Sequence, residues 1–133
     1  MGLNIKRIVK PGVVLAACGI GLVGLAAPAQ AATTASTEGC PSGYVCIYPS
    51  TNWNGGVPSL KFLTYGYHNL NNVTGNHRIF NNQTGGASAY ACSGYGGTGS
   101  VLFGLFSPGW ADEYFTPVNS VVLNASGNIP NNC

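Results

Sequence analysis

Residues 48–55 read Tyr-Pro-Ser-Thr-Asn-Trp-Asn-Gly, which is an aromatic residue, four residues, a second aromatic residue, one residue and a glycine. The same spacing recurs 42 residues later, where residues 90–97 read Tyr-Ala-Cys-Ser-Gly-Tyr-Gly-Gly. Self-similarity at a period of about 40 residues indicates a repeated structural unit. We expect each copy to be a turn whose second aromatic residue folds back against a sheet. Gly55 and Gly97 would then take the positive φ that other residues resist.

The end of each repeat is also marked in the sequence. Residues 78–81 (Arg-Ile-Phe-Asn) and residues 121–124 (Val-Val-Leu-Asn) are short apolar runs that end in asparagine before a turn-forming segment. We therefore match these two runs with each other and place the repeats at about residues 44–85 and 86–127.

The remaining pattern predicts an all-β domain. Short runs of β-branched and aromatic residues alternate with clusters of glycine, proline and asparagine, as in strands that are joined by turns. No stretch after residue 31 keeps the period of an amphipathic helix. The runs expected as strands are residues 44–48, 60–63, 78–80, 87–91, 101–103 and 120–123. Several short strands with frequent turns are typical of a sandwich with long connections.

These features resemble a known family. The aromatic turn, with Ser120 just before the closing strand, is similar to the Greek-key motif of the βγ-crystallins. Residues 40–48, Cys-Pro-Ser-Gly-Tyr-Val-Cys-Ile-Tyr, resemble more specifically the secreted actinobacterial proteins grouped as peptidase inhibitor family I36. The resemblance covers about residues 40–124 and implies a βγ-crystallin-like sandwich of two Greek-key motifs. Its motif residues are Tyr48, Trp53 and Gly55 in the first repeat and Tyr90, Tyr95, Gly97 and Ser120 in the second.

The N-terminus has the features of a secretory signal peptide. Three basic residues lie among the first ten, residues 13–27 are apolar or glycine, and residues 29–31 read Ala-Gln-Ala. We expect cleavage after Ala31, since the apolar run is shorter than the roughly 20 residues that span a bilayer. Lipidation of Cys18, which ends a Leu-Ala-Ala-Cys segment, is the alternative. After a signal peptide at residues 1–31, we expect a short mobile leader at residues 32–39 and one domain at residues 40–133.

Removal of the signal peptide changes the charge of the chain. The precursor has a formal net charge of +2, but the expected mature part keeps two basic residues against three acidic ones. They are Lys61 and Arg78, and Glu38, Asp112 and Glu113. So few cations form no basic patch, which argues against nucleic acid and against an anionic membrane surface as partners.

Four cysteines remain in the expected mature chain: Cys40, Cys46, Cys92 and Cys133. In a short exported protein they predict two disulfides, with three possible pairings. A zinc site is the alternative use, but no two of these cysteines have C-x2-C spacing. The family resemblance implies Cys40–Cys46 as a local clip, which leaves Cys92–Cys133 as the second bond. We therefore expect a disulfide-stapled domain without a metal.

Residues that could carry catalysis are few. His68 and His77 are the only histidines, and Asp112 and Glu113 are the only acidic residues in the repeats. Nothing in their spacing brings them together, and the cysteines are accounted for by disulfides, so no activated nucleophile can be identified. We expect no enzymatic activity and interpret both histidines as polar loop residues.

Calcium is the cofactor that the resemblance raises. Microbial βγ-crystallins often bind Ca²⁺ through an Asn/Asp pair followed by Ser, and residues 71–77 and 115–120 are the corresponding stretches here. His77 takes the place of the serine in the first stretch, and the second lacks the pair. Ca²⁺ prefers six to eight oxygen ligands, usually including carboxylates, and neither stretch has an acidic residue. We therefore expect no cofactor, weak calcium binding at most, and a structural role for Ser120 in the turn of its own repeat.

The aromatic residues fall into two groups. We expect Tyr48, Trp53, Tyr90 and Tyr95 to pack in the turns and the core. We expect the aromatic residues of the long connections to be more exposed; they are Tyr65, Tyr67, Trp110, Tyr114 and Phe115. Exposed aromatic side chains can contact a protein partner or stack on a sugar, and the sequence does not choose between the two.

The resemblance implies a secreted, monomeric protein that blocks an extracellular peptidase, with metallopeptidases as the characterised target class. Such a protein needs a rigid loop that enters the active site without being released as product. No inhibitory loop can be assigned from the sequence, because the expected long-range disulfide encloses no short loop in the second repeat. The alternatives are a killer-toxin-like antimicrobial protein and a cell-surface carbohydrate-binding or structural module of crystallin type.

Overall fold

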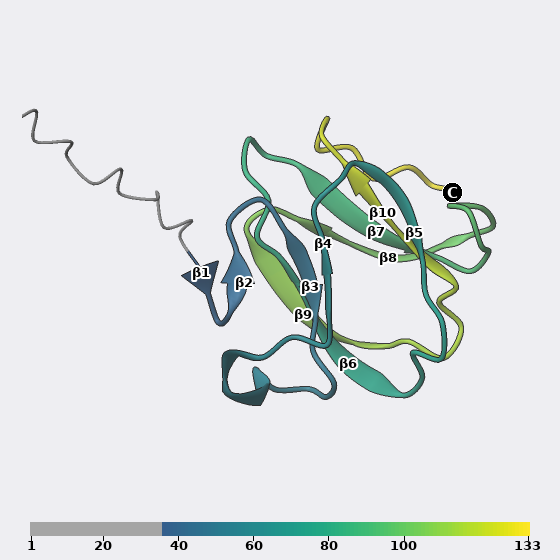
Figure 1. The fold of residues 1–133 in the computed structure, drawn as a ribbon. Coiled ribbons are helices and arrows are strands. Elements are labelled where there is room, and N and C mark those ends of the chain that lie inside the picture. The colour runs from purple at the N-terminus through teal and green to yellow at the C-terminus, as the bar shows by residue number, and fades with distance from the viewer. Residues whose placement is uncertain (1–35) are drawn as a thin grey trace, which may run out of the picture. The chain divides into compact units, whose positions relative to one another are not determined.

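The computed structural model describes residues 36–133, so the expected signal peptide and residues 32–35 lie outside the described residues. In this range the chain is all-β, with two four-stranded antiparallel sheets and a two-stranded ribbon (Figure 1). One 3₁₀ helix, η1 (Asn54–Gly56), interrupts the strands, and no helix of residues 36–133 has the length and apolar character needed to cross a membrane. The strands are β1 (Ser36–Thr37), β2 (Cys40–Pro41), β3 (Val45–Ile47), β4 (Leu60–Phe62), β5 (Gly66–Asn69), β6 (Asn76–Asn81), β7 (Ser88–Cys92), β8 (Val101–Phe106), β9 (Gly109–Tyr114) and β10 (Ser120–Asn124).

The strand order shows that the two repeats exchange one strand. The first sheet has the order β4-β3-β6-β9 and the second has the order β5-β10-β7-β8. Strand β5 therefore leaves the first repeat to pair with β10, while β9 leaves the second repeat to pair with β6. Neither four-stranded sheet can be completed by one repeat alone, so the two halves of the domain depend on each other.

The core lies between the two sheets. Alternate residues of a strand point to opposite faces of its sheet, so every second side chain of the central strands reaches the interior. The first sheet contributes Val45, Ile47 and Ile79, and the second contributes alanines of β7 together with Val121 and Leu123. Burial of each large aliphatic side chain stabilises the fold by about 1.5–3 kcal/mol relative to exposure.

Two disulfides fasten the terminal segments of the domain. Cys40 is bonded to Cys46 of β3, and Cys133 is bonded to Cys92 at the end of β7, with a Cα–Cα distance of 5.9 Å in each bond. These are the two pairs that the family resemblance implied. The C-terminal tail is also held by Ile129, which covers Gly104 so closely that a Cβ at that glycine would lie 2.7 Å from its side chain. Each bond thus joins a terminal segment to a central strand.

Residues 36–39 belong to the stretch that we expected to be a mobile leader, but the structure gives them a defined conformation. They form β1 and a turn, and β1 pairs with β2. The hydroxyl of Tyr48 donates a 2.7 Å hydrogen bond to the carbonyl of Glu38, and burial raises the pKa of this tyrosine. Gly39 lies so close to the carbonyl of Gly56 that a side chain at this position would overlap it. The segment is therefore packed against the first aromatic turn.

Candidate functional site

The first aromatic turn is anchored by Trp53. Its ring packs edge to face against three aromatic rings, with centroid distances of 5.2 Å to Tyr48, 5.6 Å to Phe80 and 5.5 Å to Trp110. The turn can close because Asn54 and Gly55 both have positive φ, 49° and 62°, as Asn and Gly tolerate best. Tyr48 is completely buried and Trp53 is partly buried, as expected for packing residues.

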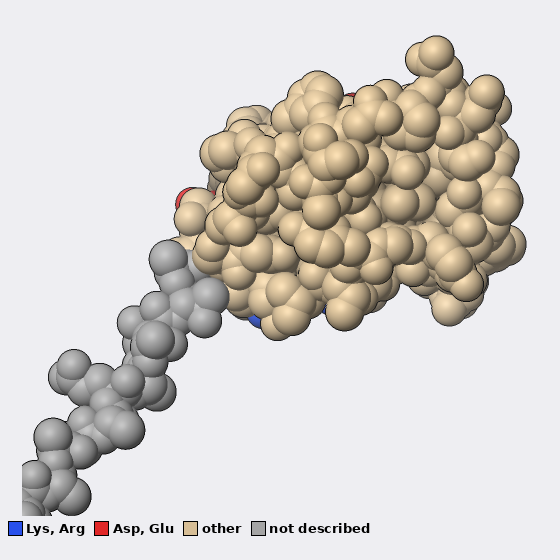
Figure 2. Space-filling model, turned by 90° about the horizontal axis from the view of Figure 1, so that it is seen from above, with Lys and Arg blue, Asp and Glu red and all other residues tan. Residues whose placement is uncertain are grey.

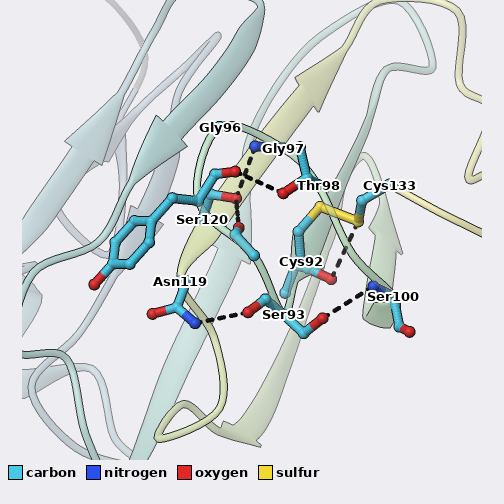
Figure 3. The surroundings of a disulfide bond; sticks show 12 residues. Cys92, Ser93, Gly96, Gly97, Thr98, Ser100, Asn119, Ser120 and Cys133 are labelled. Carbon is cyan, nitrogen blue, oxygen red and sulfur yellow. Dashed lines mark hydrogen bonds between the residues drawn. A yellow bond between two sulfur atoms is a disulfide. The ribbon is translucent and has the colours of Figure 1, made fainter.

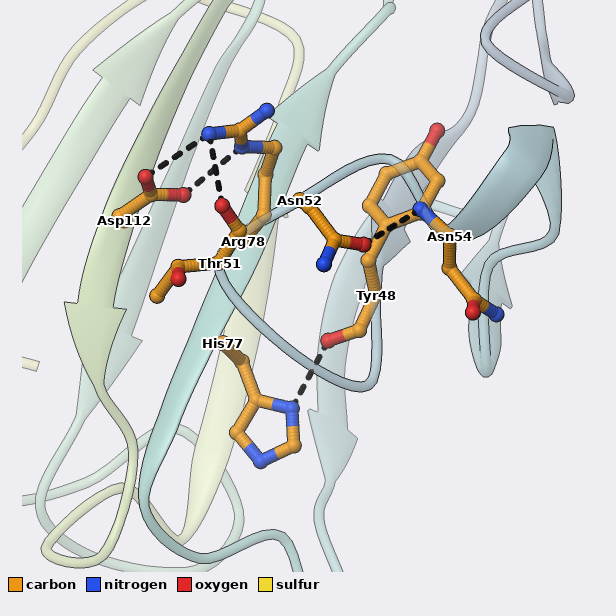
Figure 4. A network of polar contacts seen from close by, with 7 residues as sticks. All are labelled: Tyr48, Thr51, Asn52, Asn54, His77, Arg78 and Asp112. Atoms are coloured by element: carbon orange, nitrogen blue, oxygen red, sulfur yellow. Dashed lines mark hydrogen bonds and ion pairs between the residues drawn. The ribbon is translucent and has the colours of Figure 1, made fainter.

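Arg78 lies between two indole rings on the outer face of the first sheet. Its guanidinium carbon is 4.5 Å from the ring centroid of Trp53 and 4.2 Å from that of Trp110. Its Nε and Nη2 donate to the two carboxylate oxygens of Asp112 at 2.7 and 2.8 Å, in the bidentate geometry that suits arginine (Figure 4). These hydrogen bonds hold the pKa of Asp112 below its usual value. We call Trp53, Arg78, Trp110 and Asp112 the tryptophan–arginine cluster.

The residues of this cluster are brought together by the pairing of β6 with β9, which could not be predicted from the sequence. Arg78 in β6 is directly opposite Asp112 in β9, and Phe80 is opposite Trp110. Side chains opposite each other in antiparallel strands lie on the same face, so the exchange of β9 brings a tryptophan and a carboxylate beside Arg78. We did not identify Arg78 as a site residue from the sequence. Its position in the sequence could have identified it, because Arg78 directly precedes the core residue Ile79 just as Ser120 directly precedes the core residue Val121.

Residues 50–57 form a loop that is exposed and yet internally braced; we call it the first-repeat loop. Arg78 donates to the loop twice, from its backbone N–H to the carbonyl of Ser50 at 2.9 Å and from Nη2 to the carbonyl of Thr51 at 3.0 Å. The carboxamide oxygen of Asn52 accepts from the N–H of Asn54 at 2.7 Å (Figure 4). The side chain of Asn54 donates to the carbonyl of Val57 at 2.9 Å. The loop therefore has a defined conformation without being buried.

The second aromatic turn is held by Ser120. The hydroxyl of this buried serine donates to the carbonyl of Gly94 at 2.6 Å and accepts from the N–H of Gly97 at 3.0 Å (Figure 3). This is the structural role that we expected for Ser120. Gly97 has a φ of 70°, also as expected. In the first repeat, Arg78 of β6 takes the position that Ser120 has in β10. It holds the first turn through its backbone N–H and its guanidinium instead of a hydroxyl.

Tyr95 does not pack like Trp53, which corrects our expectation of equivalent turns. The side chain of Tyr95 is 57% exposed. Gly97 is instead the residue packed against the sheet, since a Cβ there would lie 3.1 Å from both Tyr67 and Val122. On the outer face of the first sheet, Phe80 and Trp110 pack against Trp53. On the second sheet, Tyr67 and Tyr90 lie opposite Val122, and Gly97 packs against Tyr67 and Val122 where a ring would otherwise lie.

The closing strands of the two repeats correspond when Ile79 is matched with Val121. Both of these residues face the core, whereas Val122 faces the other way, beside Gly97. Val121 and Leu123 are the core-facing residues of β10. Tyr90 also differs from Tyr48, because it lies in the middle of β7 and is only partly buried, whereas Tyr48 follows the end of β3.

The two histidines lie in strands rather than in loops. His77 of β6 has Nδ1 at 2.8 Å from the carbonyl of Tyr48 and Nε2 at 2.9 Å from the carbonyl of Thr74. His68 of β5 stacks on Phe62 with a centroid distance of 4.6 Å. Both side chains thus have structural partners. Within residues 36–133, no three His, Cys, Asp or Glu side chains are grouped so that they could hold a metal ion.

The remaining aromatic residues follow the expectation in part. Tyr65, Tyr67, Trp110 and Tyr114 are exposed, but the last three lie in strands β5 and β9 and not in connections. Phe115 is buried, which corrects the expectation of exposure. Its ring packs 5.4 Å from Phe103 and 5.5 Å from His77.

The two stretches considered for calcium lie next to each other. Gly75 accepts a 2.7 Å hydrogen bond from the N–H of Phe115, and its own N–H donates to the hydroxyl of Thr116 at 3.0 Å. These contacts tie the two stretches to each other, and weak calcium binding stays a prediction. No pocket was found among residues 36–133. The chain matches no model of a protein family, no curated protein and no solved structure.

Proposed function

We propose that this chain is a secreted inhibitor of an extracellular peptidase, built on the two Greek-key fold of the βγ-crystallins and related to family I36. The exchange of the third strand between the repeats supports the Greek-key assignment. Two further features support it: the hydrogen bonds between Ser120 and its turn, and the Cys40–Cys46 disulfide that encloses the Pro-Ser-Gly-Tyr segment. The two disulfides also favour an oxidising compartment and hence export.

The observation that carries the inhibitor proposal is the first-repeat loop. An inhibitor loop must be accessible to the enzyme, but it must also lose little conformational freedom when it binds. Thr51, Asn52, Asn54, Gly55 and Val57 are exposed, while hydrogen bonds within the loop and from Arg78 fix the backbone around them. Trp53 anchors the centre of the loop in the aromatic cluster.

The same loop would resist cleavage. Peptidases bind the backbone of a substrate in an extended form, whereas Asn54 and Gly55 have left-handed conformations. Extension of this turn would pull Trp53 away from Tyr48 and break the hydrogen bonds of Asn54. We therefore assign the contact with the peptidase to the exposed tip of the first-repeat loop.

A panel of purified extracellular peptidases tests this proposal, with metallopeptidases first and serine, cysteine and aspartic peptidases beside them. We expect the purified protein to inhibit hydrolysis of a fluorogenic peptide by at least one enzyme. The double variant Thr51→Ala with Asn52→Ala should weaken the inhibition about tenfold or more, which corresponds to about 1.4 kcal/mol of binding free energy.

Thr84→Ala is the matched control, because Thr84 is exposed in the connection between β6 and β7, outside this loop. It should inhibit like the unchanged protein. Absence of inhibition across all four classes would refute the proposed function. Inhibition that the loop variant leaves intact would refute the assignment of the loop alone.

A further inference from the structure

We propose that the outer face of β9 is a binding site for a neutral polysaccharide, with Trp110 and Tyr114 as stacking surfaces and the Arg78–Asp112 pair as the hydrogen-bonding group. This site adjoins the inhibitory contact proposed above, because Arg78 also donates to the carbonyl of Thr51 in the first-repeat loop. It does not depend on that function, because its argument rests on a different set of exposed side chains.

The outer face of β9 presents two aromatic side chains in one row. Trp110, Asp112 and Tyr114 alternate with Ala111 and Glu113, so the three lie on the same face of the strand. Trp110 is 52% exposed and Tyr114 is 57% exposed. Their Cα atoms are four residues apart on a strand, which is about 13 Å, the length of a few linked sugar rings. Sugars with equatorial hydroxyls offer an apolar C–H face, and such faces stack on aromatic rings.

Trp110 is held in place before any ligand binds. The guanidinium of Arg78 lies over its ring at 4.2 Å, and Trp53 packs against it at 5.5 Å, while more than half of the side chain stays accessible. A side chain that is already fixed loses little conformational entropy on binding. A flat, preorganised indole of this kind suits a rigid polysaccharide chain.

The Arg78–Asp112 pair offers donors and acceptors side by side next to the indole. Nε and Nη2 of Arg78 are used by Asp112 and by the carbonyl of Thr51 (Figure 4). Nη1 makes no hydrogen bond with any of residues 36–133, and 11% of the Arg78 side chain is exposed. Each carboxylate oxygen accepts one hydrogen bond from Arg78 and has capacity for another. Neighbouring sugar hydroxyls, which both donate and accept, complement such a pair.

Charge favours a neutral ligand. Residues 36–133 contain only five Lys, Arg, Asp or Glu residues, and on the face seen in Figure 2 only small areas of them are visible. Arg78 is neutralised by Asp112 in the one ion pair of the described residues. An acidic polysaccharide or a nucleic acid needs unpaired cations, and this site has none to offer. An uncharged chain of hexose or N-acetylhexosamine units is the ligand class that fits.

The chain carries its own probe for this site, since Trp53 and Trp110 are its only tryptophans. Titration of the purified protein with cellohexaose and chitohexaose, followed by tryptophan fluorescence, should show saturable binding to at least one. Depletion of the protein from solution by insoluble cellulose or chitin should agree. Trp110→Ala should weaken binding about tenfold or more in the depletion assay, and Tyr114→Ala should weaken it less.

Tyr67→Ala is the matched control, because Tyr67 is a similarly exposed aromatic residue on the other sheet. It should bind like the unchanged protein. Tyr114 lies outside the tryptophan–arginine cluster, so Tyr114→Ala tests the same face even if Trp110→Ala misfolds. Three results would each overturn the proposal. They are no binding to either oligosaccharide or either solid, binding that survives both variants of β9, and a fluorescence response to an unfolded polypeptide such as casein but not to the sugars.

Discussion

Gly55 and Gly97 have the same backbone conformation but different surroundings. Their φ angles are 62° and 70°, which a residue with a Cβ adopts only with strain. A Cβ at Gly55 would meet nothing within 4 Å, whereas one at Gly97 would be 3.1 Å from both Tyr67 and Val122. A side chain at Gly55 would therefore cost only backbone strain, whereas a side chain at Gly97 would cost backbone strain and also crowd its neighbours.

We expect Gly55→Ala to lower the free energy of unfolding by about 1 kcal/mol, since only the backbone preference opposes it. Gly97→Ala should cost clearly more, because Val122 and Tyr67 must also move. Urea unfolding measures both. Gly85→Ala is the control, with a φ of 70° and an equally open surrounding, and it should match Gly55→Ala. Equal losses at Gly55 and Gly97 would contradict the packing of the second turn.

Asp112 makes the stability of the domain depend on pH. Hydrogen bonds from Arg78 lower the pKa of Asp112 in the folded state. The stabilisation is therefore complete above the pKa of the unfolded chain, about 4, and is lost as the pH falls through the lower folded-state pKa. Because the carboxylate is partly exposed, we expect a loss of less than about 1 kcal/mol.

Urea unfolding between pH 7 and pH 2 tests this dependence. Asp112→Asn should remove part of the acid destabilisation, because the titrating group is gone. Glu113→Gln is the matched control, since Glu113 makes no ion pair with any described residue. A pH profile that Asp112→Asn leaves unchanged would show that the pair adds nothing to stability.

At the scale of the elements, the last strand of each repeat braces a turn. In β10 the hydroxyl of Ser120 bonds the backbone of Gly94 and Gly97, and in β6 Arg78 bonds the carbonyls of Ser50 and Thr51. The two residues precede the core residues Val121 and Ile79, so they occupy corresponding places. A short polar side chain suffices in the second repeat because the turn lies directly on the strand there. The longer arginine in the first repeat also reaches Asp112 on the neighbouring strand β9.

Ser120→Ala should lower the free energy of unfolding by about 1–3 kcal/mol, because it leaves a partly buried backbone N–H and a partly buried carbonyl without their partner. The Gly97 amide should also exchange its hydrogen faster. Ser126→Ala is the control: its hydroxyl bonds Asn124 on the surface, and the change should stay within about 0.5 kcal/mol. A variant at Ser120 with unchanged stability and unchanged exchange at Gly97 would contradict this role.

At the scale of the whole described domain, strand exchange and two disulfides connect parts that are distant in sequence. Strands β5 and β9 each complete the sheet of the other repeat. Cys40–Cys46 closes a separation of 6 residues, and Cys92–Cys133 closes one of 41. The second bond restricts the unfolded chain far more, so the two bonds contribute unequally to stability.

The chain-entropy model gives about 4 kcal/mol for the Cys92–Cys133 bond and about 2 kcal/mol for the Cys40–Cys46 bond. We therefore expect the paired change Cys92→Ala with Cys133→Ala to destabilise the domain more than Cys40→Ala with Cys46→Ala. Hydrogen exchange should show that residues 127–133 open first in the former variant. Denaturant unfolding gives the ranking, and the reverse order would mean that local packing around Cys40 outweighs loop closure.

The sequence by itself determined the all-β class and the two turns with positive φ at Gly55 and Gly97. These features depend on neighbours along the chain and on local backbone preferences, which a spacing pattern records. The residues alone left three disulfide pairings open, and only the family resemblance selected one. Only the tertiary structure decided the exchange of β5 and β9, the exposure of Tyr95, the burial of Phe115 and the place of Arg78 between Trp53 and Trp110. The physical reason is that alternation along a strand shows which of its side chains share a face of the sheet, but not which strand will pair with it. Contacts across a sheet therefore depend on pairings between segments that are distant in the sequence.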